Sequence, residues 1–169
     1  MGDKRAFTMV ELIFVIVILG ILAAVGVSKL SATRTDAEIV KLVANLNGLI
    51  NDVQSYYATQ HKAADSLKAM TNVGFERIDD YTGHLLSFGK KCVKIGFIET
   101  TANKPAHLKI SDGDDKETSI CTKILTSKPL AEFKNMDFKY NLESGGGLAS
   151  GTTSPKGEIL VEPQAIVVW

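Results

Sequence analysis

The stretch that decides the fold runs from Lys4 to Val27 and reads KRAFTMVELIFVIVILGILAAVGV. From residue 7 to residue 27, its only polar side chains are those of Thr8 and Glu11. A helix of about 21 residues is about 31 Å long, which is enough to cross the hydrocarbon core of a bilayer. Lys4 and Arg5 precede the apolar run, so the positive-inside rule predicts a cytoplasmic N-terminus and export of the rest of the chain.

Three kinds of protein begin with a segment of this type. A cleaved secretory signal peptide has an apolar region of about 7–15 residues. The region here is longer, although Ala24-Val25-Gly26 supplies small residues for a cleavage site. An uncleaved membrane anchor explains the length but gives no reason for a carboxylate at Glu11. The third kind is a subunit that uses the segment to assemble with other copies of itself.

Glu11 is the residue that separates these interpretations. An isolated carboxylate near the hydrocarbon is costly unless it is paired or lies near the interface. Glu11 lies about one helical turn after Phe7, so it could sit at the depth of the lipid headgroups without a partner. In an assembly that excludes water, it would instead need a cation from a neighbouring subunit. The α-amino group created by a cut before Phe7 would supply that cation.

The stretch from Ala6 to Leu12, followed by the apolar run with Gly20-Ile21-Leu22-Ala23-Ala24, closely resembles the type IV prepilin signature. That signature is shared by type IV pilins and by the pseudopilins of type II secretion. The resemblance implies that a prepilin peptidase cuts between Ala6 and Phe7 at the cytoplasmic face and methylates the new amino terminus of Phe7. It also implies assembly roles for Glu11, which pairs with the N-terminus of a neighbouring subunit, and for Gly20.

Two positions depart from the common form of this signature. Family members usually have glycine before the cut, where this chain has Ala6, a residue that is also small and predicts slower processing. Many members have proline where this chain has Ser28. Since proline kinks or interrupts a helix, serine at this position predicts a straighter helix.

The helix is expected to continue beyond the membrane segment, over residues 7–59. Apolar residues recur there at steps of three and four, which is typical of one face of an α-helix. They are Ile39, Leu42, Val43, Leu46, Leu49, Ile50, Val53 and Tyr57. Gly48 weakens the helix by only about 1 kcal/mol relative to alanine. We expect this face to pack on a head domain over residues 60–169, with residues 1–6 as the leader.

The head is expected to be a four-stranded antiparallel sheet packed on the long helix, which is an α+β pilin fold. Alternating apolar residues predict strands over residues 92–98, 106–110, 136–142 and 159–161. Residues 165–169 are also expected to be strand, and Pro163 makes residues 159–161 and 165–169 either an edge strand or two short strands. Residues 119–127 favour a short helix, with a strand as the alternative, and residues 63–70 form either a second helix or a loop.

The two cysteines of the chain, Cys92 and Cys121, lie in the predicted head. They do not form a CxxC pattern, and no histidine lies close to either in the sequence, so a zinc site is not supported. If the head is outside the cytoplasm, a disulfide is expected. It would close a loop of about 30 residues and contribute roughly 3–4 kcal/mol. Two free buried thiols are the alternative.

Several polar features of the head were weighed as sites. Asp112, Asp114 and Asp115 bring together carboxylate oxygens of the kind that calcium prefers, and some pseudopilins bind calcium. The glutamate of an EF-hand is missing at the required distance, so a solvated turn is the alternative, and no other cofactor is expected. The Gly-, Ser- and Thr-rich residues 144–157 lack the Gly-Lys-Ser/Thr of a phosphate-binding loop and predict a flexible surface loop.

No pattern in the chain predicts an enzyme. His61, His84 and His107 lie far apart, without a cysteine or acidic partner at a motif spacing, so each is expected to be exposed or hydrogen-bonded. Lys+Arg and Asp+Glu number 19 each, which gives no net charge to attract nucleic acid. A dense basic run is also absent from the sequence, so nucleic acid is not an expected partner.

The function predicted from the resemblance is that of a structural subunit of a type IV pilus or a type II secretion pseudopilus. Such a protein is a single-pass protein of the bacterial inner membrane, with its head in the periplasm or on a cell-surface pilus. Its partners are other pilins or pseudopilins, the prepilin peptidase and the inner-membrane assembly platform. Two alternatives stay open: a periplasmic binding domain released by an ordinary signal peptidase near Val27, and a competence minor pilin for DNA uptake.

Overall fold

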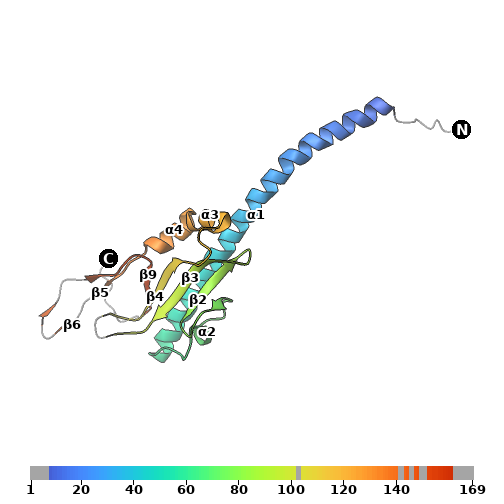
Figure 1. Cartoon of the computed structure of the whole chain (residues 1–169). Coiled ribbons are helices and arrows are strands. Elements are labelled where there is room, and N and C mark those ends of the chain that lie inside the picture. Colours follow the sequence, from blue (N-terminus) through green and yellow to red (C-terminus); the bar gives the residue numbers. More distant parts are fainter. Residues whose placement is uncertain (1–7, 102–103, 141–142, 145–146, 149–151, 162–169) are drawn as a thin grey trace. The chain divides into compact units, whose positions relative to one another are not determined.

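The computed structural model describes residues 8–101, 104–140, 143–144, 147–148 and 152–161 (Figure 1). The chain divides into two compact units, Met1–Ala37 and Glu38–Trp169. The first unit contains the start of helix α1, which runs over Met9–Gln60. The second unit contains the rest of α1 and all other described elements.

The second unit is built on an antiparallel sheet with the strand order β1-β2-β3-β4-β9 (Figure 1). The five strands are β1 (Glu76–Arg77), β2 (Thr82–Ser87), β3 (Lys90–Ile98), β4 (His107–Asp112) and β9 (Glu158–Leu160). Phe88 and Gly89 join β2 to β3 with φ angles of 49° and 73°. Left-handed conformations at both central residues are those of a type I′ turn, which matches the twist of a tight hairpin.

Three short helices accompany the sheet: α2 (Leu67–Met70), α3 (Ser119–Leu125) and α4 (Lys128–Asn135). Helices α3 and α4 follow β4, and the chain then forms two further strand pairs before it returns to the sheet as β9. These pairs are β5 (Lys139–Tyr140) with β8 (Thr152–Thr153), and β6 (Glu143–Ser144) with β7 (Gly147–Leu148).

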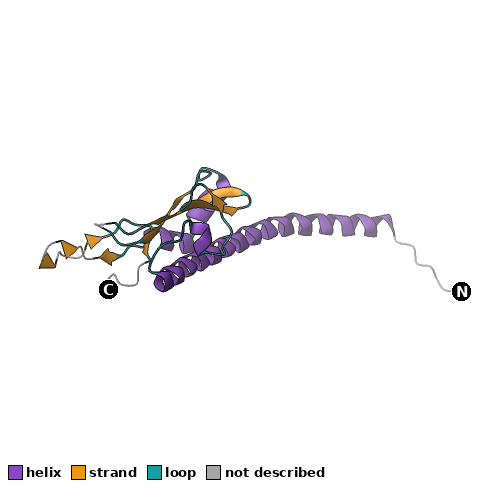
Figure 2. Cartoon of the chain, turned by 90° about the horizontal axis from the view of Figure 1, so that it is seen from below, coloured by secondary structure: helices purple, strands orange, loops and turns teal. Residues whose placement is uncertain are grey.

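One face of the C-terminal part of α1 supplies six of the 21 buried residues of the core cluster. Figure 2 shows the sheet lying on one side of this part of the helix. The buried helical residues are Leu42, Leu46, Leu49, Ile50, Val53 and Tyr57, with Ile39 and Val43 partly buried. They meet residues of β2, β3 and β4 such as Leu85, Ile95 and Leu108, and residues of α3 and α4 such as Ile124 and Leu130, in one continuous cluster. The predicted helical face is therefore the face that packs.

The α+β class, the long helix and the antiparallel sheet are confirmed. The count of four strands is wrong, because β1 and β2 add an unpredicted edge to the sheet. Only Lys139–Tyr140 of the predicted strand 136–142 pairs as a strand in the described residues, and α4 precedes it. The stretch 144–157 contains paired residues rather than an unpaired loop. The strand predicted over 165–169, and Pro163, lie outside the described residues.

A buried polar group holds the last strand of the sheet. Lys104 makes an ion pair with Glu158, whose side chain is only 4% exposed. The imidazole of His107 has a neighbour at each nitrogen. Its Nε2 atom lies 3.8 Å from Glu158 Oε1, and its Nδ1–H donates to the carbonyl of Pro105 at 2.8 Å. The ring of His107 also lies against that of Phe138, with 5.9 Å between centroids. His107 is therefore satisfied by hydrogen bonding, as predicted, but it is buried.

Burial of this imidazole predicts that acid weakens the fold. Desolvation lowers the pKa of His107 from its ordinary value near 6.5, and the charges of Lys104 and Lys109 act in the same direction. The unfolded chain therefore takes up this proton at a higher pH than the folded chain does. The free energy of unfolding should fall as pH falls below about 6.5, by at most about 1.4 kcal/mol per pH unit for one proton.

The measurement is urea unfolding of the full chain in detergent between about pH 7.5 and pH 5.5. The variant His107→Gln should flatten this dependence even if it lowers stability at every pH. His61→Asn is the matched control, because His61 is exposed and its φ of 54° is one that asparagine adopts readily. An equal pH dependence in His107→Gln and in the wild type would contradict the assignment.

Candidate functional site

The N-terminal part of α1 is the most apolar surface that the structure describes. The segment Met9–Gly26 has a mean hydropathy of 2.8, and none of it is buried. By length and composition, it is a helix that could cross a membrane. Phe14 is 66% exposed and Leu22 is 63% exposed, so this unit offers these side chains no cover of its own. A bilayer or neighbouring apolar helices would cover them.

Glu11 is the one acidic residue in this segment, and the structure fixes its carboxylate by a reciprocal cap. The backbone N–H of Thr8 donates to Glu11 Oε2 at 2.8 Å, and the Thr8 hydroxyl donates to the same oxygen at 2.9 Å. In return, the backbone N–H of Glu11 donates to Thr8 Oγ1 at 3.3 Å. This is a capping box, in which the residue before a helix and its third residue satisfy each other's free N–H groups.

The cap leaves half of the carboxylate available. Both Thr8 donors go to Oε2, and no hydrogen bond joins Glu11 Oε1 to another described residue. A carboxylate can accept from several donors, so Oε1 can bind a cation while the cap stays intact. The arrangement can therefore stabilise the helix start within one chain and accept a charged donor from another chain.

Gly20 is not required by packing against any residue that the structure describes. A Cβ atom built at this position meets nothing within 4 Å. A glycine on an exposed helix surface lets another backbone approach closely. Its predicted role in assembly stays a prediction. Ala6 and Phe7, the two residues of the predicted cut, lie outside the described residues.

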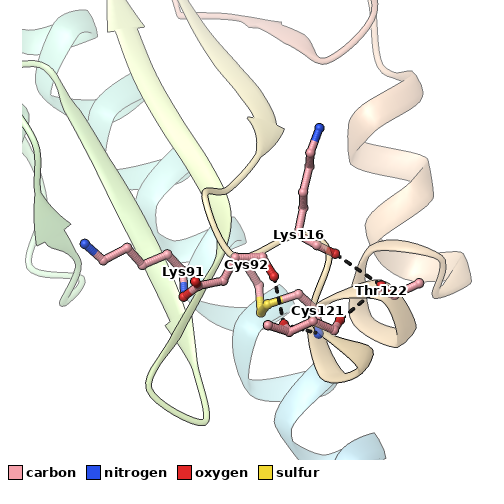
Figure 3. The surroundings of a disulfide bond; sticks show 7 residues. Lys91, Cys92, Lys116, Cys121 and Thr122 are labelled. Atoms are coloured by element: carbon pink, nitrogen blue, oxygen red, sulfur yellow. Dashed lines mark hydrogen bonds between the residues drawn. A yellow bond between two sulfur atoms is a disulfide. The ribbon is translucent and has the colours of Figure 1, made fainter.

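The disulfide expected between Cys92 and Cys121 is present, and it joins β3 to α3 (Figure 3). The two Cα atoms are 5.0 Å apart, and both residues are fully buried. The start of α3 is also capped, because Thr118 Oγ1 accepts from the N–H of Cys121. Thr122 then donates its hydroxyl to the carbonyl of Lys116 at 3.1 Å (Figure 3). The loop between β4 and α3 is thereby fixed at its far end.

The three carboxylates proposed for calcium do not gather around one point. Asp112 accepts from the ammonium of Lys134 at 2.5 Å, and Asp115 Oδ2 accepts from the backbone N–H of Lys91 at 2.9 Å. Asp114 Oδ1 lies 3.4 Å from the imidazole of His84. In the described part of the chain, no group of three or more His, Cys, Asp or Glu side chains is arranged to hold a metal ion. Calcium binding stays a prediction, and it would require Asp112 and Asp115 to exchange these partners.

Comparison with protein families identifies the N-terminal segment. Residues 1–27 match the family model described as the prokaryotic N-terminal methylation motif. These residues carry the type IV pilin-like signature. Neither the curated proteins nor the solved structures compared with the chain give a match. The signature covers Ala6, Phe7, Glu11 and Gly20, and the fold behind it is the α+β arrangement of a long helix and an antiparallel sheet that is pilin-like.

Two residues of interest were not predicted from the sequence. Thr8 was counted only as a polar residue, although Thr-x-x-Glu before an apolar run is itself the sequence signal of a capping box. His84 was expected to be exposed or hydrogen-bonded, and this is wrong. It is buried, and neither ring nitrogen has a hydrogen-bond partner among the described residues. No local pattern around His84 could have shown this, because the residues that cover it come from distant parts of the sequence.

Proposed function

We propose that this protein is a structural subunit of a type IV pilus or a type II secretion pseudopilus. It is made as a prepilin, cut between Ala6 and Phe7, methylated on Phe7 and assembled through the N-terminal part of α1. The match of residues 1–27 to the methylation motif carries this proposal. The exposed apolar helix supports it, and so does the carboxylate of Glu11, because the cap from Thr8 uses only its Oε2 atom.

The chemistry of assembly follows from the exposed surface. Side chains from Met9 to Val25 lose water when they enter a bilayer, and this burial favours insertion. Packing on neighbouring helices then replaces lipid contacts by van der Waals contacts between helices. A contact between different ends of successive subunits extends into a helical filament when its rotation does not close a ring. The α-amino group of a neighbour's Phe7 would meet Glu11 in this apolar surrounding, where an ion pair is strongest.

The orientation proposed places the N-terminus in the cytoplasm and the second unit in the periplasm. Lys4 and Arg5 before the apolar run favour this direction. The Cys92–Cys121 disulfide is consistent with it, because disulfides persist in oxidising compartments. Assembly partners would be copies of this chain and related pilins, together with the peptidase and the assembly platform.

The first test is the mass of the N-terminal peptide of the protein isolated from membranes. A peptide that begins at Phe7 and carries one methyl group is expected. A start near Val27 would mean an ordinary signal peptide and a released binding domain, and an intact N-terminus would mean a simple anchor. Either of these results would overturn the proposal.

Two variants sharpen this test. Ala6→Leu puts a bulky side chain before the cut and should leave the precursor unprocessed. Ala6→Gly is the matched control and should be processed at least as fast as the wild type. Equal processing of all three forms would show that the cut does not lie after residue 6.

A further inference from the structure

One edge of the sheet is open beyond β1. The short strand β1 pairs only with Gly83 and His84, so the last three residues of β2 have no strand beside them on that side. The N–H of Ile78 donates to the carbonyl of Thr82 at 2.9 Å, so the backbone groups of Thr82 face this edge. Since these groups point alternately to the two sides of an antiparallel strand, those of Leu86 face the same edge. No hydrogen bond joins them to another described residue there.

The open part of this edge lacks the usual protection. Folded proteins protect sheet edges with charged side chains, proline or a covering segment. The strand β1 follows this rule, because its two residues, Glu76 and Arg77, are both charged and exposed. The open part of β2 reads Leu-Leu-Ser without a charge, and Leu86 is 41% exposed. An uncharged open edge of this kind can accept an extended segment as a further strand.

A groove lies between this open edge and helix α1. Its volume is about 450 Å³, and its apolar lining consists of Leu42, Phe75, Leu85 and Leu86. Lys41 and Asn45 of α1 add an ammonium and an amide, and the amide makes no hydrogen bond to another described residue. A Cβ atom built at Gly74, which also lines the groove, meets nothing within 4 Å, so there is space beside it. Apolar walls with a few polar groups are typical of a binding site.

Residues 165–169 of this chain have the chemistry that such a groove accepts. They read AIVVW and contain no charge, proline or glycine. β-Branched and aromatic residues are those that favour strands. In an added strand the side chains alternate, so one row would enter the apolar groove while the backbone pairs with Leu86. Residues 165–169 lie outside the described part of the chain, which they follow after β9.

This segment cannot reach the groove of its own head. Val161, just after β9, donates to the carbonyl of Ala106, level with the end of β3, whereas Leu86 is paired near the start of β3. Four strand spacings and about seven residues along β3 separate the two places, a distance of about 30 Å. The six residues from Val161 to Val167 span at most about 22 Å. The groove can therefore receive this segment only from another copy.

We propose that the groove beside β2 binds residues 165–169 of a neighbouring copy by strand addition. The donor segment follows β9 and the acceptor edge lies beyond β2, at opposite sides of the same sheet (Figure 1). A contact between different surfaces of successive copies continues from one copy to the next. The inference rests on the proposed function, because a filament holds copies side by side. It adds a contact between heads to the contact made by the N-terminal part of α1.

The test is cross-linking between two full-length forms that are co-expressed in the same cells. One form carries Leu86→Cys, the other carries Val167→Cys, and a short bis-maleimide reagent joins thiols on adjacent strands. The native cysteines do not react, because they form a disulfide. The control pair is Lys123→Cys with Val167→Cys, since Lys123 is exposed on α3. The test pair should give about tenfold more mixed dimer than the control pair, because a docked segment has a high effective concentration.

Further changes in the donor chain test whether its backbone is recognised. Ala165→Pro/Ile166→Pro removes N–H groups on both sides of the segment, so cross-linking should fall to the control level. The matched variant Ala165→Thr/Ile166→Thr keeps these groups and should retain most of the yield.

Three results would overturn strand addition between copies. They are a yield at the control level, a full yield with the two prolines, and a dimer from Leu86→Cys alone, which would indicate that two open edges pair with each other. The N-terminal residue is determined in the same samples. A normal cut before Phe7 together with any of these results leaves the proposed function standing, whereas an uncut chain without cross-linking overturns both.

Discussion

Replacement of Glu11 by valine is expected to stop filament assembly while leaving membrane insertion intact. Valine is more apolar than glutamate, so the segment Met9–Gly26 enters the bilayer at least as well. The partner's amino group would then lie in an apolar surrounding without a counter-charge, and removal of one member of a buried pair is strongly destabilising. The yield of filaments recovered from cells should fall on the order of tenfold or more.

The variant Glu11→Gln separates the two roles of this side chain. Glutamine can still accept the Thr8 hydrogen bonds and keep the capping box, but it carries no charge. If the pairing with a neighbour's amino terminus drives assembly, Glu11→Gln should fail almost as completely as Glu11→Val. Normal filaments from Glu11→Gln would show that the cap alone matters, and normal filaments from Glu11→Val would refute the pairing. Processing at Phe7 is scored in the same samples, so a failure of cleavage is not mistaken for a failure of assembly.

The long helix could be predicted because its signals are local and repeated. Steps of three and four along residues 39–57 follow directly from the geometry of an α-helix, and each of these apolar residues is at least partly buried. The membrane segment is likewise a matter of length and composition. The pairing of Cys92 with Cys121 followed from there being two cysteines in a chain expected to be exported.

The edge of the sheet could not be predicted because β2 lacks the usual signals. Its sequence, Thr82–Ser87, includes Gly83 and His84, which do not alternate with apolar residues. The glycine is needed for packing, since a Cβ atom there would lie 2.3 Å from the ring of Phe75. Phe88 also occupies a left-handed turn position where asparagine or glycine is the usual signal of a hairpin. Tertiary packing, rather than local propensity, thus selects this strand.

The candidate sites also divide into features that the local sequence predicts and features that only tertiary packing brings together. The predicted cut and the predicted role of Glu11 come from residues adjacent in the sequence, and Thr8, the capping partner of Glu11, belongs to the same local pattern. The carboxylates of Asp112, Asp114 and Asp115 are neighbours in the sequence, yet their side chains turn to three different partners. Spacing along a loop does not fix the direction of its side chains, and the contact of Asp114 with His84 depends on the pairing of β2 with β3.

Loss of the Cys92–Cys121 disulfide is the second change with a large expected effect, and it acts on the head alone. The bond joins positions 29 residues apart, so it removes loop entropy from the unfolded chain and should contribute about 3–4 kcal/mol to the free energy of unfolding. The double variant Cys92→Ala/Cys121→Ala should lose this amount, measured by urea unfolding of the full chain with proteolysis of the head as the readout. Reduction of the wild type is the matched control, because it breaks the bond without removing the sulfur atoms from a fully buried site. Reduction should account for most of the loss, and the difference between the two measurements gives the cost of the cavity. A loss below about 1 kcal/mol on reduction would mean that the bonds of the β4–α3 loop to β3 hold α3 in place without the disulfide.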